Sequence, residues 1–243
     1  FMEHPRDHAL TLIPRSPTLF RDAAFYDVHA AADGTMVAGR FALTERTLEE
    51  DGIPNASVTL LPRRRRRSRV SRLRERFGGH RARQRAGYGW YTLDDPAASF
   101  DAFQLIVNLE QRPHPENRVL LGARQDRLGL PEPELHWRWK DGDQAELDRL
   151  RSVIARALEE AALGRVEIQS VLRPDPNAHH HAGTTRMSVD ARGGVVDAHG
   201  RVHGVANLFV TGASVLPTAG FANPTLTIVA LAIRLADHLA ERL

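Results

Sequence analysis

Three consecutive histidines, His179 to His181, are the residues of this chain best suited to acid–base or metal chemistry. A neutral imidazole is the natural proton acceptor near pH 7, and it is also a common metal ligand. Consecutive side chains on an extended segment point to opposite sides, so at most His179 and His181 could share a metal. The chain has no cysteine, and no carboxylates stand at ligand spacing around the histidines. The sequence therefore predicts an acid–base site and no metal site.

A second candidate group begins where an apolar helix starts. Asn223 and Pro224 precede the run Thr225 to Leu239 and suit the N-cap and the first helical position. The helix is apolar on nearly every side, so we expect it to be buried. Its free amides and positive dipole end would face an electron-rich partner.

The segment before that helix has the composition of a buried strand followed by an open turn. Asn207 to Thr211 is a short apolar run of the kind found in parallel sheets. Gly212, Ala213 and Ser214 follow it, and small residues there let a ligand approach the backbone. Because ligands bind at the carboxyl ends of such strands, we expect Gly212 and Ala213 to border a ligand.

Seven short motifs stand in order in this part of the chain. They are His180-x-x-Gly183-Thr184, Arg186-Met187, Val195-Val196-Asp197, Arg201-Val202-His203-Gly204, Asn207-Leu208, Ser214-x-x-Pro217-Thr218 and Asn223-Pro224-Thr225. In this order they resemble the C-terminal part of the glucose-methanol-choline (GMC) oxidoreductases, which are flavin enzymes that oxidise alcohols. The resemblance is strongest to the pyranose-oxidase and sugar-dehydrogenase branch of that family.

The resemblance implies an activity, a cofactor and residue roles. It implies FAD-dependent oxidation of a CH–OH group of a sugar, glycoside or polyol, with hydride transfer to flavin N5. His180 would be the catalytic base, and Asn223 would donate a hydrogen bond to the developing alkoxide. Five residues would lie beside the flavin: Gly212, Ala213, Asn223, Pro224 and Thr225. His181 remains the competitor for the role of base, and His4 and His181 are the candidates for contacts with substrate.

The expected fold combines α/β and α+β parts. Residues 1–172 are expected to form a GMC-type substrate domain, an antiparallel sheet with helices. Residues 173–243 would be the C-terminal strand and helix of a Rossmann-like FAD-binding domain. A helix is predicted from a capping box at Asp143 and Glu146 to a stop at Gly164. Strands are predicted at Met36–Leu43, Ser57–Leu61, Phe103–Leu109, Arg118–Gly122, Glu134–Trp139 (with Leu135, Trp137 and Trp139 on a buried face) and Val166–Leu172.

An arginine-rich insertion at 63–89 interrupts the first domain. It holds twelve arginines and one acid, Glu75, whereas the whole chain has a net charge of only +3. Val70, Leu73 and Phe77 have the spacing of a short amphipathic helix. No nucleic-acid-binding module surrounds this segment, so we expect a surface insertion and no nucleic-acid partner.

The chain contains no G-x-G-x-x-G motif, which GMC enzymes use to bind the ADP half of FAD. We therefore expect that part from a second chain or from an N-terminal segment absent here. A catalytically silent scaffold or binding subunit is the alternative, but the intact His180, Gly183-Thr184 and Asn223 argue against it. Arg234 and Asp237 interrupt the most apolar stretch, so no membrane span is expected. The default compartment is the cytoplasm.

Overall fold

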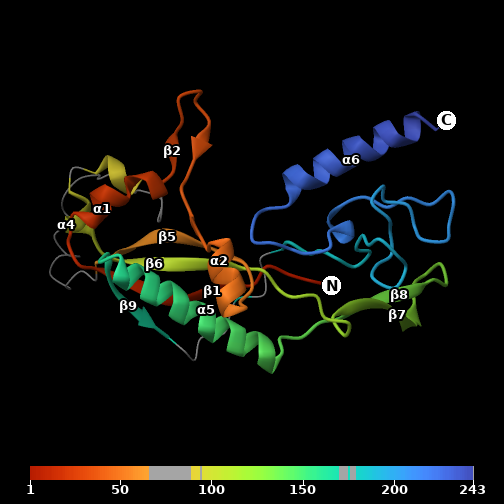
Figure 1. Cartoon of the computed structure of the whole chain (residues 1–243), viewed down its shortest axis with the longest axis horizontal. Coiled ribbons are helices and arrows are strands. Elements are labelled where there is room, and N and C mark those ends of the chain that lie inside the picture. The colour runs from red at the N-terminus through yellow and green to blue at the C-terminus, as the bar shows by residue number, and fades with distance from the viewer. Residues whose placement is uncertain (66–88, 94, 170–174, 176–178, 243) are drawn as a thin grey trace.

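The computed structural model of the protein describes residues 1–65, 89–93, 95–169, 175 and 179–242 (Figure 1). Its strands are β1 (Arg6–Pro14), β2 (His29–Ala30), β3 (Met36–Val37), β4 (Phe41–Ala42), β5 (Ala56–Arg64), β6 (Phe100–Leu109), β7 (Arg118–Gln125), β8 (Pro131–His136) and β9 (Gly164–Ile168). Its α-helices are α1 (Leu19–Asp22), α2 (Glu45–Asp51), α4 (Pro96–Ser99), α5 (Asp141–Glu160) and α6 (Thr225–Ala240).

Five strands form an antiparallel sheet in the order β4-β5-β6-β1-β9. The apolar residues of β6 alternate along the strand, and Phe103, Leu105 and Val107 are each 0% exposed. The expected strands Ser57–Leu61 and Phe103–Leu109 are confirmed within β5 and β6. The expected antiparallel sheet is therefore present in the first part of the chain.

The long helix α5 covers one face of this sheet (Figure 1). Leu147, Leu150 and Leu158 lie on its buried face. The Asp143 carboxylate accepts a hydrogen bond from the backbone N–H of Lys140 at 3.0 Å. Helix α5 thus begins two residues before Asp143, and Asp143 takes the N3 position that was expected for Glu146.

A buried ion pair joins α5 to the central strands. The guanidinium of Arg151 donates to the two oxygens of Asp7 at 2.9 and 2.7 Å. The side chains are 1% and 0% exposed, and hydrogen bonds to Asp7 raise the pKa of Arg151. Because the Asp7 carboxylate is removed from water, loss of Arg151 would leave a buried negative charge without its charged partner.

The expected strand Met36–Leu43 is wrong as a continuous element. Only Met36–Val37 and Phe41–Ala42 are strands, and they belong to different sheets. Between them the backbone N–H of Gly39 donates to the Phe25 carbonyl at 3.0 Å, and a Cβ at Gly39 would collide with the Phe25 ring. The chain thus leaves the β2–β3 hairpin and enters the sheet edge at a close contact that needs glycine.

The last predicted strand of the first domain is only partly covered by the structure. β9 occupies Gly164–Ile168 and pairs with β1, which agrees with the start of the expected strand Val166–Leu172. Positions 170–172 of that expectation lie outside the described residues. So does most of the arginine-rich insertion, including the helix expected at Val70 to Phe77.

The hairpin β7–β8 differs from expectation in its burial. Strand β8 ends at His136, before the expected end at Trp139, and Leu135 on it is 55% exposed, so the predicted burial is wrong at Leu135. Trp137 and Trp139 are partly buried, and Trp139 packs against the main core. The partner strand β7 likewise exposes Leu121 at 77%. Strands β7 and β8 pair only with each other, so no third strand or second layer covers them within the described residues.

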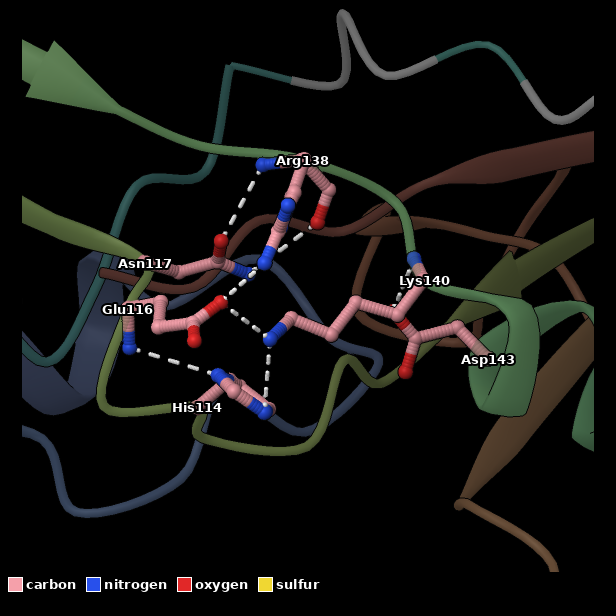
Figure 2. Close-up of polar contacts among 6 residues, drawn as sticks. All are labelled: His114, Glu116, Asn117, Arg138, Lys140 and Asp143. Atoms are coloured by element: carbon pink, nitrogen blue, oxygen red, sulfur yellow. Dashed lines mark hydrogen bonds and ion pairs between the residues drawn. The ribbon is translucent and has the colours of Figure 1, made fainter.

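A polar network fastens the base of this hairpin to the start of α5 (Figure 2). The side chain of Asn117 accepts from the Arg138 N–H at 3.0 Å and donates to the Arg138 carbonyl at 3.3 Å. Glu116 accepts from Arg138 and from Lys140 Nζ, which also contacts His114 Nε2 at 2.8 Å. Hydrogen bonds from Lys140 and then Arg138 lower the pKa of Glu116 to about 2.

The C-terminal part of the chain contains little regular structure before α6. The run Asn207–Thr211, expected as a buried parallel strand, makes one isolated antiparallel bridge between Phe209 and Arg201. Leu208 in that run is 50% exposed. This expectation is wrong within the described residues, because no parallel strand lies beside the run to cover it.

The structure confirms the helix predicted at Thr225–Leu239 as α6, but the prediction that it is buried is wrong within the described residues. None of its residues is buried, and Leu226 is 82% exposed. Figure 1 shows α6 lying apart from the sheet, on the same side of the molecule as the β7–β8 hairpin. Among the described helices, none is long and apolar enough to cross a membrane.

Candidate active site

The first residues of the chain run beside the histidine segment. Met2 and Ala182 exchange backbone hydrogen bonds of 2.9 and 3.0 Å. Arg6 and Asp175 exchange bonds of 2.8 and 2.7 Å further along the same antiparallel pairing. Residues far apart in sequence are thereby aligned, and His4 lies opposite His180.

The imidazole rings of His4 and His180 are in direct contact. Their Nδ1 atoms lie 3.1 Å apart, and the ring centroids are 5.0 Å apart with an angle of 74° between the planes. The Nε2–H of His4 donates to the carbonyl oxygen of Ala219 at 2.8 Å. His4 is only 2% exposed, and both of its ring nitrogens are engaged within the chain. Neither is left for the substrate contact expected from the sequence.

Glu3 holds the backbone around this pair. One of its carboxylate oxygens, Oε1, accepts from the N–H groups of both His4 and His180, each at 2.9 Å. The other, Oε2, lies 2.9 Å from Nε2 of His181. Glu3 is buried, whereas the side chain of His181 is 57% exposed. The two adjacent histidines are thus in different surroundings.

The electrostatics of His180 favour a neutral ring. Burial lowers the pKa of His180 below its ordinary value, and electrostatic interactions with His4 and Arg6 act in the same direction. Glu3 opposes them by raising the pKa, but its effect is smaller. A histidine with a lowered pKa is unprotonated near pH 7, so His180 can accept a proton there.

The Gly-Thr motif joins the histidines to the segment expected beside a cofactor. Gly183 has φ of 83°, and a Cβ there would collide with the Met2 side chain. The Gly183 N–H donates to the Ala213 carbonyl at 3.3 Å. Thr185 pairs with Ser214 through its backbone N–H at 2.9 Å and its hydroxyl at 2.8 Å. The structure therefore brings Ala213 beside the loop that carries His180.

Asn223 does not form the helix cap expected from the sequence. Pro224 occupies the N-cap position, with φ of −80° and ψ of −3°, and no side chain caps the helix. Asn223 is exposed, and within the described part of the chain its side chain has no hydrogen-bond partner. Proline supplies the N-cap turn because its ring fixes φ near the helical value. The amide of Asn223 is left available for another contact.

These features fit the flavin that the resemblance implies. The first-turn amides of α6 have no side-chain partner at the N-cap, which suits an electron-rich ring edge. Gly212 has φ of 111°, and a Cβ there would meet no atom within 4 Å, so a ligand can approach its backbone closely. Among the described residues, no group of three or more His, Asp or Glu could hold a metal ion.

Sequence reasoning missed three contributors to the site. They are Glu3, the Ala219 carbonyl, and the bond from the Gly220 N–H to Glu110 Oε1 at 3.1 Å. A main-chain carbonyl has no signature in sequence. Glu3 stands beside the singled-out His4, but nothing in the local pattern indicates that it would bind a backbone far along the chain.

His180, with its lowered pKa and its contact with His4, is suited to removing a proton from a bound group. Residues 113–232 match the family model described as GMC oxidoreductase, which covers the C-terminal domain of that family. Residues 113–232 of this chain are therefore a GMC oxidoreductase C-terminal domain.

Several curated relatives are named as oxidases or dehydrogenases of sugars or glycosides. The C-glycoside 3-oxidase of Microbacterium trichothecenolyticum is 35% identical over 152 residues, 62% of this chain and 29% of that protein. The C-glycoside 3-oxidase of Arthrobacter globiformis is 40% identical over 152 residues, with the same shares. The fructose dehydrogenase large subunit of Gluconobacter japonicus is 35% identical over 143 residues, 57% of this chain and 25% of that protein. The chain thus spans less than a third of each relative's length.

Proposed function

We propose that this chain supplies the substrate side and the catalytic base of an FAD-dependent oxidoreductase that oxidises a CH–OH group of a sugar, glycoside or polyol. The observation that carries the proposal is the half-buried His180 of lowered pKa, held against His4, in a chain whose residues 113–232 are a GMC oxidoreductase C-terminal domain. The names of the C-glycoside and fructose relatives support a carbohydrate substrate.

His180 would accept the proton of the substrate hydroxyl. When the O–H bond breaks, the proton moves to the imidazole, and the oxygen electrons form the new C=O bond as the C–H bond breaks. Bound FAD would supply the acceptor for the hydrogen of that C–H bond together with its two electrons. His181 is a weaker candidate for the base, because its Nε2 already contacts the Glu3 carboxylate.

Asn223 would hold the substrate oxygen from the other side. Its exposed amide has no partner among the described residues and lies just before Pro224, the N-cap of α6. A donor placed toward developing negative charge contributes about 2.7–4 kcal/mol to lowering a barrier. The cofactor contacts would come from the backbone at Gly212 and Ala213 and from the helix start at Pro224 and Thr225.

Replacement of the base tests this proposal. His180→Ala should lower the rate of anaerobic flavin reduction by roughly 10²–10⁴-fold, the usual contribution of a general base. The FAD content should stay unchanged, because His180 is assigned to proton transfer and not to cofactor binding. His181→Ala is the matched control and should retain most of the rate. If His181→Ala loses the activity and His180→Ala keeps it, the base is His181.

We further propose that the nucleotide-binding part of the enzyme, on a second chain or another segment, covers helix α6. Leu226, Val229 and Ile233 lie on one face of α6 at helical spacing and are 82%, 49% and 58% exposed. The similarity to GMC oxidoreductases supports the proposal that the nucleotide-binding part contacts this face of α6.

A charge on that helix face tests the proposed assembly. Val229→Glu should reduce FAD retention in the complete protein, because it places a carboxylate in an apolar contact. Val189→Glu is the matched control, because Val189 is 99% exposed and is not part of α6. Equal FAD content in the two variants would contradict the proposed contact.

A further inference from the structure

We propose that His4 is a positioning residue that selects the tautomer of His180. The inference rests on the proposed function, in which His180 is the base, and it adds how the ring is prepared for that task. Nothing in the motif pattern contains this information, because it depends on a contact between residues at opposite ends of the chain.

The hydrogen-bond partners of His4 determine where its proton lies. The carbonyl oxygen of Ala219 can only accept, so Nε2 of His4, 2.8 Å away, carries the hydrogen. A neutral imidazole has one N–H, which leaves Nδ1 of His4 as an acceptor. The Nδ1 atom of His180, 3.1 Å from it, must then be the donor. When both rings are neutral, His180 therefore carries its hydrogen on Nδ1.

This assignment makes Nε2 of His180 the nitrogen that can receive a proton. An imidazole accepts a proton only at the ring nitrogen that lacks one, and the bond at the other nitrogen sets which one that is. A neutral histidine in water favours the Nε2–H form, in which Nε2 is already occupied. The contact with His4 would shift His180 to the opposite form and would fix the ring plane at the same time.

Several contacts hold the two rings in register. Glu3 Oε1 accepts the backbone N–H of each histidine at 2.9 Å, so one buried carboxylate holds both residues. Met2 and Ala182 exchange two backbone hydrogen bonds next to the pair. His179 adopts φ of 60°, a strained conformation for a non-glycine residue, immediately before His180. These contacts hold the backbone in a conformation that brings the His180 ring against the His4 ring.

The tautomer can be observed directly in the intact flavoprotein that contains this chain. With ¹⁵N-labelled imidazole rings, the His180 signals are identified by their absence in His180→Gln. At a pH where the ring is neutral, NMR should show the hydrogen on Nδ1 in the unmodified protein. Hydrogen on Nε2 of His180 in that spectrum would overturn the proposal without need of any variant at position 4.

Two substitutions of His4 then separate positioning from packing. His4→Phe keeps a ring but offers no acceptor, so the hydrogen of His180 should move to Nε2. His4→Asn places an oxygen near the former Nδ1 and should keep it on Nδ1. His8→Phe is the matched control, because His8 lies on the same segment but outside the pair, and it should leave the His180 signals unchanged. An unchanged tautomer in folded His4→Phe would contradict the role of His4.

Flavin reduction by D-fructose or a phenyl C-glucoside, whichever reduces the unmodified protein, provides the kinetic readout. His4→Phe should slow the reduction roughly 10- to 100-fold, a part of the usual contribution of a general base, with little change in the substrate concentration for half-maximal rate. His4→Asn should recover part of the loss. If His180→Gln abolishes reduction while His4→Phe does not affect it, the proposed function stands and this inference fails. If His180→Gln retains the rate, the proposed function itself fails.

Discussion

The sheet region and the C-terminal region of this chain differ in how far the apolar side chains of their helices and strands are buried. In the sheet region, Leu105 of β6 and Leu150 of α5 are each 0% exposed. In the C-terminal region, α6 has no buried residue, and Leu226 is 82% exposed. The apolar side chains of the first region pack into a buried core, whereas the second region contains an apolar helix that the described residues leave exposed.

The candidate site lies where these two regions meet. His4 immediately precedes β1 of the sheet, whereas His180 and Ala219 belong to the C-terminal part. The residue that positions the proposed base is therefore attached directly to the sheet, whose core is buried. The comparison predicts large stability effects for changes inside the sheet region and small ones for changes on α6.

The largest effect on stability is expected at the buried ion pair. Arg151→Met leaves the Asp7 carboxylate, 0% exposed, without its charged partner. Removing one partner of such a pair costs roughly 3–5 kcal/mol in the free energy of unfolding. Urea denaturation measures the loss. Arg156→Met on the exposed face of the same helix is the control, and a similar loss there would show that the helix, and not the pair, is sensitive.

A pair of leucines tests the comparison between the two regions itself. Leu105→Ala should lower the free energy of unfolding by about 2–5 kcal/mol, because it leaves a cavity in a closed core. Leu226→Ala should change that free energy by no more than about 0.5 kcal/mol in the chain on its own, because the side chain is exposed. Urea denaturation measures the free energy of unfolding of both variants. Equal losses would mean that the side chain of Leu226 is buried in the folded chain.

A smaller effect is expected in the pH dependence of flavin reduction. Because the pKa of His180 is lowered, its ring stays unprotonated to a lower pH than a free imidazole. The rate should therefore be constant near pH 7 and fall on acidification, by about tenfold per pH unit once the pH is below that pKa. Arg6 helps to lower the pKa, so Arg6→Gln should move the acidic limb to higher pH. A limb that does not move would contradict the contribution of Arg6 to the lowered pKa of His180.

Much of the fold could be predicted from local patterns. The alternation in β6 and the helical spacing in α5 predict both elements, because each buries one face against the other within this chain. The β7–β8 hairpin and the Asn207 run mislead for the same physical reason. An apolar pattern indicates that a surface can be buried, but it does not say whether the covering partner belongs to the same chain.

The site was predictable in part. The sequence indicates His180 through its spacing from Gly183-Thr184, and it indicates the helix that begins at Thr225. It also draws attention to His4, but as a residue expected to contact substrate. It contains no sign that Glu3 binds the His180 backbone or that the Ala219 carbonyl holds His4.

The sequence by itself determined the helix α6 and the strands β5 and β6, and its ordered motifs determined the family resemblance and, through it, the candidate base. These follow from residue types at short spacings, which local chemistry and periodicity control. Only the tertiary structure decided which nitrogen of His180 carries the hydrogen and which apolar surfaces are left exposed. Both depend on contacts between segments far apart in the chain, such as the contact between His4 and His180. Such contacts form only when the whole chain folds.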